Sequence, residues 1–307
     1  MRHLLLLANP SASGFTGALF REVVRILEAD FAVDAEWPHG AAATRRRASE
    51  AAGEGYHVVA AMGGDGVAHH AANGLAYTAA ALGIIPAGTT NVLARIFKLP
   101  RDPKRAAHAM ASLSALPTRM ASIEAETRGG PLSEFATFAF GAGYDADVVA
   151  SAEERPQSKI WLGGAHYAQS ALAKLLLEWR SRPANLEAAI DGDRATGVAV
   201  LVQVHFPYTY FGPVPLQITD GPVDGLATVV VDSLEVLRAA EIFVRAATRR
   251  PLPQRLGAAV WEGFGELAID ADPATPLQAD GEFLGVASRV VVTEAPDSLL
   301  ALRMDQD

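Results

Sequence analysis

The stretch at residues 60–74, AAMGGDGVAHHAANG, places three glycines and one acid between two runs of small apolar residues. The overlapping segment YHVVAAM, residues 56–62, is a continuous apolar run, typical of a strand buried on both faces. The alanine-rich residues that follow the glycines predict a helix. A glycine-rich turn between a strand and a helix lets backbone N–H groups approach a phosphate beside the positive end of the helix. Residues 60–74 therefore predict an anion-binding strand–loop–helix unit.

The same alternation runs through the first third of the chain. Further strands are predicted at HLLLLAN, FAVDAEW and LGIIPAG, with helices such as GALFREVVRILEAD between them. This order favours an open, mostly parallel sheet, in which ligands bind beyond the carboxyl ends of the strands. Three loops rich in small residues follow such ends: NPSASG, GGDG and PAGTTN. One loop of this kind is commonly a tight turn, but three at one edge favour a nucleotide-phosphate site. Neither GxxxxGK[ST] nor GxGxxG after the first strand is present.

The pattern changes near residue 119 to short alternating segments separated by Gly, Pro and Asp. These segments indicate a second, mainly antiparallel β domain, which we expect to be a β-sandwich. The predicted fold is thus an α/β domain at residues 1–118, with a β-rich acceptor domain at residues 119–297. We expect residues 298–307 to pack back on the first domain. Two helices are predicted within the second, at residues 159–180 and 233–250.

Composition excludes several classes of protein. The 307 residues include no cysteine, which rules out disulfides, thiolate metal sites and cysteine nucleophiles. A formal net charge of −9 argues against a nucleic-acid partner. The apolar runs fall short of the roughly 20 residues that span a bilayer, and the opening MRHLLLLANPSASG fits a first strand better than a signal peptide. The sequence predicts a cytoplasmic protein that meets lipid only at the membrane surface.

Seven motifs, in order, resemble the diacylglycerol kinase catalytic-domain family, which includes bacterial lipid kinases and the sphingosine and ceramide kinases. They are NPSASG, GGDG…NGL, LGIIPAGTTNVLAR, FGAGYDADVV, FPYTYFG, DGL and QADGE, spread over residues 3–303. The resemblance implies an ATP-binding domain like that of NAD kinases, joined to a β-sandwich with the active site between them. It also implies Mg²⁺-assisted phosphoryl transfer from ATP to a lipid hydroxyl.

Three acids are the catalytic candidates that this resemblance implies: Asp65 on the glycine loop, and Asp280 and Glu282 in the late DGE motif. Phosphoryl transfer needs positioning, charge neutralisation and a carboxylate that orients or deprotonates the attacking hydroxyl. We expect Asp280 and Glu282 to face Asp65, one acting as base and one as orienter or metal helper. The structural alternatives are a helix-capping carboxylate at Asp65 and an ordinary Asp-Gly turn at residues 280–281.

The predicted ATP-binding residues lie in the three loops. They are Asn9, Pro10, Ser11, Ser13, Gly14, Gly63, Gly64, Asp65, Gly66, Val67, His69, Gly88, Thr89 and Asn91. The chain departs from the family pattern GGDGTxNE, because Val67, His69 and His70 replace its threonine, asparagine and glutamate. Val92 stands where many relatives have aspartate. His69 is similar to the sphingosine-kinase-like pattern GGDGxxHE, while relaxed selection on the loop explains it equally well.

A metal site is implied at Asp224 and the carbonyl of Leu226. The family's usual second acid falls at Gly221 in this chain, and Asp220 is one residue further back. The expected cofactors are ATP and Mg²⁺.

For other candidate binding residues, the sequence allows a purely structural role as well as a functional one. Residues 45–47, three arginines, fit a solvated helix face or a phosphate clamp. The aromatic residues Trp161 and Tyr167 and those of FPYTYF fit the core or a lipid pocket. A basic cluster near Ile242 and Phe243 suits the end of a helix dipole or an anionic lipid surface. The cluster is Arg245, Arg249, Arg250 and Arg255.

The sequence leaves the acceptor open between a diacylglycerol-like lipid and a sphingoid base or ceramide. An NAD kinase is an alternative enzyme, and a non-catalytic nucleotide- or lipid-binding regulator is an alternative of another class. The expected partner is a membrane lipid contacted peripherally, and an exposed sheet edge in the β domain would allow a homodimer.

Overall fold

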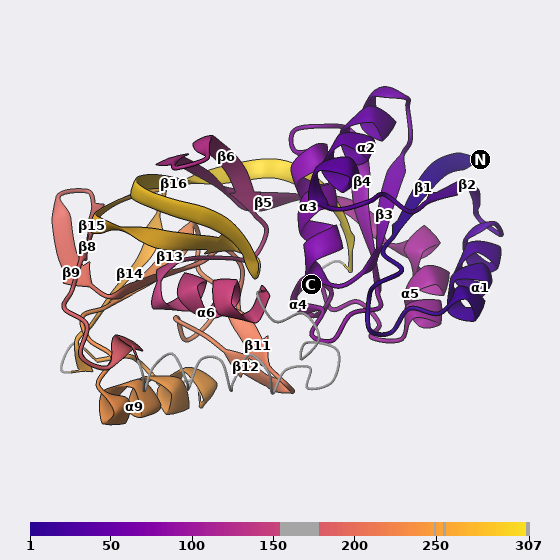
Figure 1. Cartoon of the computed structure of the whole chain (residues 1–307). Coiled ribbons are helices and arrows are strands. Elements are labelled where there is room, and N and C mark those ends of the chain that lie inside the picture. The colour runs from indigo at the N-terminus through magenta and orange to yellow at the C-terminus, as the bar shows by residue number, and fades with distance from the viewer. Residues whose placement is uncertain (154–177, 249, 254–255, 305–307) are drawn as a thin grey trace. The chain divides into compact units, whose positions relative to one another are not determined.

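The computed structural model describes residues 1–153, 178–248, 250–253 and 256–304 (Figure 1). The chain divides into two compact units, Met1–Met120 with Pro296–Asp307, and Ala121–Ala295. Trp161, Tyr167, Arg249 and Arg255 lie outside the described residues, as does the helix predicted at residues 159–180 up to residue 177.

The first unit is built on a parallel sheet in the order β16-β4-β3-β1-β2. The registers pair Ala8 with Met62 and Gly63 with Pro86, so neighbouring strands end at the same edge. The elements of this unit are β1 (Arg2–Ala8), α1 (Gly17–Leu27), β2 (Phe31–Glu36), α2 (Ala41–Gly53), β3 (Val58–Gly63), α3 (Asp65–Leu75), β4 (Ala81–Pro86), α4 (Val92–Ile96), α5 (Pro103–Ala109) and the end of β16 (Glu282–Arg303).

Helices cover both faces of this sheet. Figure 1 shows α1 and α5 on one face and α2 and α3 on the other. Alternate residues of β1, such as Leu4 and Leu6, pack with Val23 and Leu27 of α1 in one buried cluster. Since β1 also buries Leu5 and Leu7, it needs apolar side chains on both faces, as the run LLLL predicts.

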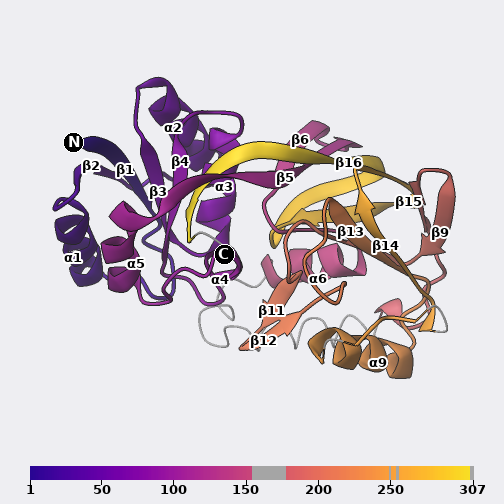
Figure 2. The same ribbon diagram turned by 180° about the vertical axis from the view of Figure 1, so that it is seen from behind.

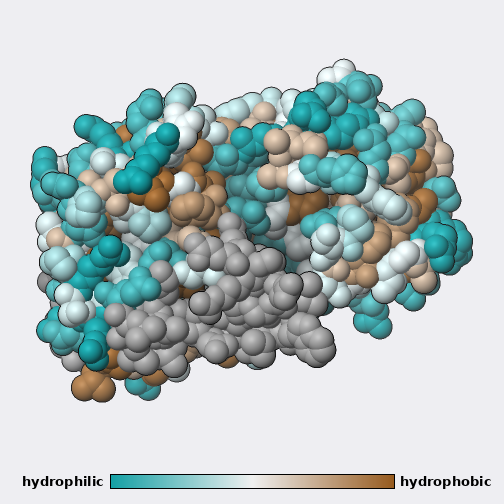
Figure 3. Space-filling view, in the orientation of Figure 1, coloured by the Kyte–Doolittle hydropathy of each residue, from teal (hydrophilic) through white to brown (hydrophobic). Residues whose placement is uncertain are grey.

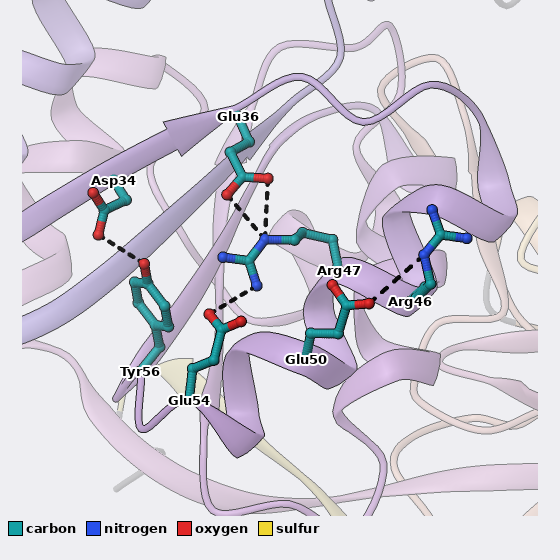
Figure 4. A network of polar contacts seen from close by, with 7 residues as sticks. All are labelled: Asp34, Glu36, Arg46, Arg47, Glu50, Glu54 and Tyr56. Atoms are coloured by element: carbon teal, nitrogen blue, oxygen red, sulfur yellow. Dashed lines mark hydrogen bonds and ion pairs between the residues drawn. The ribbon is translucent and has the colours of Figure 1, made fainter.

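A polar network joins α2 to the edge strand β2 (Figure 4). The Nε of Arg47 donates to both carboxylate oxygens of Glu36, at 2.9 and 3.0 Å, and its Nη1 donates to Glu54 at 3.0 Å. Only 17% of the Arg47 side chain is exposed, whereas Arg46 is exposed and lies 3.7 Å from Glu50. The interpretation of this arginine run as a solvated face is therefore wrong for Arg47, which ties α2 to the end of β2.

The second unit is an antiparallel β domain with the strand order β14-β13-β10-β7-β15-β16 (Figure 2). Its elements are β5 (Ser114–Thr127), β6 (Gly130–Ala136), β7 (Ala139–Gly143), α6 (Tyr144–Glu153), β8 (Leu186–Ile190), β9 (Asp193–Gly197), β10 (Ala199–Gln203), β11 (Thr209–Phe211), β12 (Val214–Leu216), β13 (Leu226–Val231), α9 (Val236–Ala247), β14 (Ala258–Phe264), β15 (Glu266–Ala279) and the first part of β16.

The long strand β15 changes partners along its length. Residues 268–271 pair with β8, and residues 277–279 pair with β7. Its pairing with β16 shifts register between Asp270 and Thr275, and such irregularities bend a strand. The sheet thereby curves around one buried cluster that includes Phe140, Leu267 and Leu277. The predicted combination of an α/β domain and a mainly antiparallel β domain is confirmed.

Two helices were not predicted from the sequence. The helix α5 begins with Asp102 as its N-cap, whose side chain accepts from the backbone N–H of Arg105. The helix α6 begins directly after β7, within the motif FGAGYDADVV. Among the described residues, no helix combines the length and the apolar character that a membrane crossing requires.

Candidate functional site: phosphate loops and motif acids

The three predicted phosphate loops meet at the carboxyl edge of the first unit, because β1, β3 and β4 are neighbours. Backbone hydrogen bonds link the loops to one another. The N–H of Asn9 donates to Met62 O at 2.9 Å, and the N–H of Ala87 donates to Gly63 O at 2.8 Å. The N–H of Gly14 also reaches the carbonyl of Ala87, at 2.8 Å. Because these strands are neighbours in the sheet, the three loops form one continuous surface at its carboxyl edge.

Side chains from these loops fix their shape. The Oδ1 of Asn9 accepts from the N–H of Ser11 at 2.9 Å, and the hydroxyls of Ser13 and Thr89 lie 3.1 Å apart. Asn91, with a φ of 50°, holds Gly88 from both sides: its Oδ1 accepts from Gly88 N at 3.0 Å, and its Nδ2 donates to Gly88 O at 2.8 Å. The structure brings these predicted ATP-binding residues together, with Pro10 and Gly14 exposed beside them.

Two glycines allow the second and third loops to touch. A Cβ on Gly88 would lie 2.4 Å from the Cα of Gly64 and 3.0 Å from the Oδ1 of Asn91. A Cβ on Gly64 would lie 3.6 Å from the Cα of Gly88, which is an ordinary contact. Only Gly88 is therefore required to be glycine by this packing.

Substituting Gly88→Ala is expected to destabilise the protein by about 1–3 kcal/mol, because the added methyl group collides with backbone. Gly64→Ala is the matched control and is expected to change the free energy of unfolding by less than about 1 kcal/mol. Chemical denaturation of both variants measures the difference. Equal stabilities would contradict the close packing of the two loops.

Asp65 is the first residue of α3, but its carboxylate serves another helix. Its Oδ1 accepts from the N–H of Leu93 at 3.1 Å, at the start of α4, while the N-cap of α3 itself is Gly64, without a side-chain bond. Asp65 therefore caps a helix, as the structural alternative predicted, but that helix is α4 and not α3, the helix that begins at Asp65. Asp65 joins the second loop to the helix that follows the third, so a partly buried carboxylate stands at the loop edge.

A cavity of about 160 Å³ opens beside the third loop. Two arginines line it that the sequence analysis did not single out. Arg95 lies one turn into α4, and Arg101 follows that helix. Guanidinium groups beside loop N–H groups favour an anionic ligand such as a phosphate. The signal in the sequence was the arginine four residues after Asn91 in GTTNVLAR. The cavity is lined by Pro86, Gly88, Thr89, Thr90, Asn91, Ala94, Arg95 and Arg101.

The residues that depart from the family pattern contribute to packing in α3. The side chain of Val67 is buried, and its Cγ1 would lie 2.5 Å from a Cβ on Gly63. His69 is also buried, with its ring 4.9 Å from that of His70 in an edge-to-face arrangement. The carbonyl of His69 accepts from the Nδ2 of Asn73 at 3.0 Å. A direct role of Val67, His69 or Gly66 in ATP binding stays a prediction.

In the second unit, Asp280 is a buried carboxylate with four hydrogen-bond donors. Its Oδ2 accepts from the N–H and the hydroxyl of Thr137, at 2.7 and 2.8 Å, and its Oδ1 accepts from the N–H groups of Phe138 and Ala139, at 2.9 and 3.0 Å. The backbone of Asp280 has a φ of 54°, in the left-handed region. Both oxygens are engaged, so Asp280 suits the role of orienter better than that of base. Glu282, partly buried, follows at the start of β16.

Residues from three late motifs form a buried polar cluster. The motifs were named from the sequence, but these residues were not singled out. The Oδ2 of Asp145 accepts from Tyr208 Oη at 2.8 Å and from Gln278 Nε2 at 2.6 Å. Gln278 also accepts from the N–H of Gly281 at 2.9 Å through its Oε1. The cluster therefore connects FGAGYDADVV and FPYTYFG with the turn of QADGE. The signal was a set of polar residues inside otherwise apolar motifs.

Burial perturbs the acid–base properties of this cluster. Burial of the carboxylate raises the pKa of Asp145, although hydrogen bonds from Tyr208 and Gln278 partly oppose the rise. Burial, followed by the negative charge of Asp145, raises the pKa of Tyr208 well above its usual value. Tyr208 therefore stays a hydrogen-bond donor throughout the physiological range.

Asp145→Asn is expected to gain stability relative to the wild type as the pH rises. The folded wild type holds a proton on Asp145 over a pH range in which the unfolded chain has lost it, so ionisation costs stability from about pH 4 up through the folded pKa. Asparagine does not ionise, so it does not lose stability in this way. Its side-chain oxygen can still accept from both Tyr208 and Gln278. Thermal unfolding from pH 4 to 8 measures the effect, with the exposed Asp193→Asn as control. A difference between Asp145→Asn and the wild type that stays constant with pH, or moves the other way, would refute the raised pKa.

The predicted metal site offers few donors. Asp224 is exposed in the turn before β13, where Leu226 begins the strand at a register shift. At the position of the usual second acid, Gly221 contributes no carboxylate, and its carbonyl accepts from the hydroxyl of Thr219 at 2.6 Å. Since Mg²⁺ demands near-ideal octahedral coordination, one carboxylate and one carbonyl do not fit a closed protein site.

The first part of the chain is similar in sequence to known proteins. Residues 3–123 match the family model described as the diacylglycerol kinase catalytic domain. Two curated relatives carry the name "Probable lipid kinase YegS-like". The relative from Xanthomonas oryzae pv. oryzae is 32% identical over 145 residues, and that from Pseudomonas aeruginosa is 33% identical over 147. The matched regions cover 45% and 47% of this chain, but only 44% of the length of each relative.

Solved structures show the same fold over nearly the whole chain. A diacylglycerol kinase from Bacillus anthracis str. Sterne has a TM-score of 0.71 at 17% identity, and the alignment covers 98% of this chain and 97% of that one. A second structure from the same organism has a TM-score of 0.77 at 19% identity, covering 98% and 95%. At these identities the likeness establishes the fold alone. The family model and the curated relatives add a likeness in sequence, which for the family model covers residues 3–123: this part of the chain is similar to the diacylglycerol kinase catalytic domain.

Proposed function

We propose that the protein is an ATP-dependent lipid kinase, which transfers the γ-phosphoryl group of ATP to a hydroxyl of a diacylglycerol-like or sphingoid lipid. The observation that carries this proposal is the cross-linked edge formed by the loops after β1, β3 and β4, together with the two arginines that line the cavity beside the third loop. The similarity of residues 3–123 to the diacylglycerol kinase catalytic domain and the names of the curated relatives support it.

In this proposal the loops of the first unit hold the phosphates of MgATP. Backbone N–H groups and the guanidinium groups of Arg95 and Arg101 neutralise charge that builds up on the transferred group. Asp65, fixed by its bond to Leu93, supplies a carboxylate at the same edge. The Mg²⁺ enters with the nucleotide, so no separate protein site is required for it.

Glu282 is assigned the role of general base, and Asp280 that of positioning residue. A base takes the proton of the lipid hydroxyl while the hydroxyl oxygen bonds to the γ-phosphorus and the bond to ADP breaks. Asp280 cannot take that proton without losing donors from Thr137, Phe138 or Ala139. Its role is to hold the turn that presents Glu282, with Gln278 bonded to the same turn.

An acceptor screen tests the proposal. Purified protein is given ATP labelled at the γ-phosphate and Mg²⁺, with diacylglycerol, monoacylglycerol, sphingosine, ceramide and NAD offered separately in mixed micelles. Label in one lipid supports the proposal and names the acceptor class. Label in NAD alone would replace it with the NAD kinase alternative. ATP binding without transfer to any acceptor would favour a regulator, the alternative to which Val67, His70 and Val92 point.

A further inference from the structure

The helix α9 exposes several large apolar side chains, while Arg238 and Arg245 on the same helix are partly buried. Its exposed positions are Val236, Leu237, Ala240, Phe243 and Val244, which fall at helical spacings i, i+1, i+4, i+7 and i+8. Leu237 is 86% exposed, Val244 53% and Phe243 44%. A helix on the surface of a water-soluble protein has the opposite arrangement, with its apolar stripe against the core. We call the five exposed residues the apolar stripe of α9.

The arginines of α9 make polar contacts within the helix and with the residues that flank it. Arg245 donates to Glu241 at 2.9 Å and to the carbonyl of Pro251 at 3.0 Å. Arg238 donates to the hydroxyl of Ser233 at 3.3 Å and lies 3.6 Å from Glu235. No residue of α9 is fully buried. The N–H of Gln217, directly after β12, donates to the carbonyl of Ala246 at 3.3 Å, so α9 is attached to the unit through a residue outside the apolar stripe.

The stripe continues onto the hairpin of β11 and β12. The ring of Phe211 meets that of Phe243 edge to face, with 5.5 Å between centroids. Phe211 is 39% exposed and Val214 37% exposed. Figure 3 shows hydrophobic side chains protruding at the lower margin of the molecule, over α9. Together the helix and the hairpin form one exposed apolar surface.

The sequence around α9 carries a charge opposite in sign to that of the whole chain. Residues 232–255 contain five arginines and three acids, whereas the whole chain has a formal net charge of −9. Two of these arginines, Arg249 and Arg255, lie outside the described residues, and Arg250 is exposed. A locally basic, amphipathic segment is attracted to anionic lipid head groups while its apolar side chains enter the acyl boundary. A second copy of the chain fits less well, since a standard interface uses about 20–30 residues on each side.

We propose that α9 and the β11–β12 hairpin dock on an anionic phospholipid bilayer, with the apolar stripe inserted at the interface. The inference deepens the proposed function, on which it rests, because a kinase that phosphorylates a membrane lipid must meet the bilayer. It assigns that contact to one helix and one hairpin of the second unit.

Vesicle binding tests the proposal without relying on catalysis. Flotation is measured with vesicles of phosphatidylcholine, alone or mixed with phosphatidylglycerol, for the wild type and for the double variant Leu237→Gln/Val244→Gln. The variant is expected to bind mixed vesicles at least roughly tenfold more weakly, because two inserted side chains lose their apolar transfer. Tyr77→Gln, at a residue 68% exposed in the other unit, is the control and is expected to bind normally.

A fluorescent probe provides an independent measurement. The chain has no cysteine, so Leu237→Cys creates a single labelling site for an environment-sensitive dye. Mixed vesicles are expected to shift its emission to the blue, and the same dye on Tyr77→Cys is expected not to respond. Failure of the wild type to bind, equal binding of the double variant, or no shift at residue 237 would overturn the proposal. So would a dimer that the double variant dissociates while vesicle binding is unchanged.

The two proposals fail separately. Vesicle binding that depends on the apolar stripe, together with no phosphoryl transfer to any lipid, keeps the docking surface and rejects the kinase. Transfer to a short-chain, dispersed diacylglycerol by a protein that ignores vesicles keeps the kinase and rejects the docking surface.

Discussion

Glu282→Gln is expected to lower turnover by about 10²–10⁴-fold, the usual contribution of a positioned general base. Glutamine has nearly the same shape, but it cannot take the proton of the lipid hydroxyl. Because Glu282 lies partly exposed at the start of β16, the melting temperature is expected to stay within a few degrees of the wild-type value. Steady-state rates of phosphoryl transfer, measured beside thermal unfolding, separate the two effects.

The control for this prediction is Glu266→Gln, at an exposed glutamate on the same antiparallel pair of strands. Its turnover is expected to match that of the wild type. Wild-type turnover in Glu282→Gln would exclude Glu282 as the base. A loss of turnover that only follows a loss of folded protein would give it a structural role.

Asp280→Asn is expected to cost about 3–5 kcal/mol of folding free energy, the largest effect on stability that we predict. The carboxylate accepts four hydrogen bonds, and an amide would set two N–H groups against donors from residues 137–139. Asparagine tolerates the left-handed backbone at this position, so the substitution changes the hydrogen bonding and leaves the turn geometry acceptable.

Asp191→Asn is a closely matched control for this change. Asp191 has a φ of 49° and also precedes a glycine with positive φ, in the hairpin between β8 and β9, but it is exposed. Its substitution is expected to change stability by less than about 0.5 kcal/mol. Urea denaturation of both variants measures the difference, and similar midpoints would contradict a structural role for the Asp280 carboxylate.

Periodicity and turn residues predicted much of the first unit. The runs LLLL and HVVAAM specify strands buried on both faces, and Gly-rich loops mark their ends, so the parallel sheet and its loop edge follow from local pattern. The bond from Asp65 to Leu93 could not be predicted in this way, because it joins residues 28 apart that only the strand order brings together. The same is true of the contact between Gly64 and Gly88.

The second unit was less accessible to sequence reasoning. Its strands alternate visibly, but the cluster of Asp145, Tyr208 and Gln278 spans 133 residues and depends on β7, β10 and β15 lying near one another. The motifs contain these polar residues, but their spacing in the sequence does not indicate that they contact one another. A helix was predicted at residues 233–250, which include α9, but periodicity alone cannot show that its apolar side faces outward. That orientation is visible only in the structure, where Leu237 is 86% exposed and Val244 53% exposed.

The most direct test of the kinase proposal compares ATP labelled at the γ-phosphate with ATP labelled at the α-phosphate, using purified protein, Mg²⁺ and the best acceptor lipid. The proposal predicts label in the lipid from γ-labelled ATP only, with one ADP formed for each phosphorylated lipid. Label from α-labelled ATP would indicate transfer of a nucleotidyl group. Bound ATP with no label transferred from either position to any lipid would contradict the assignment of a lipid kinase.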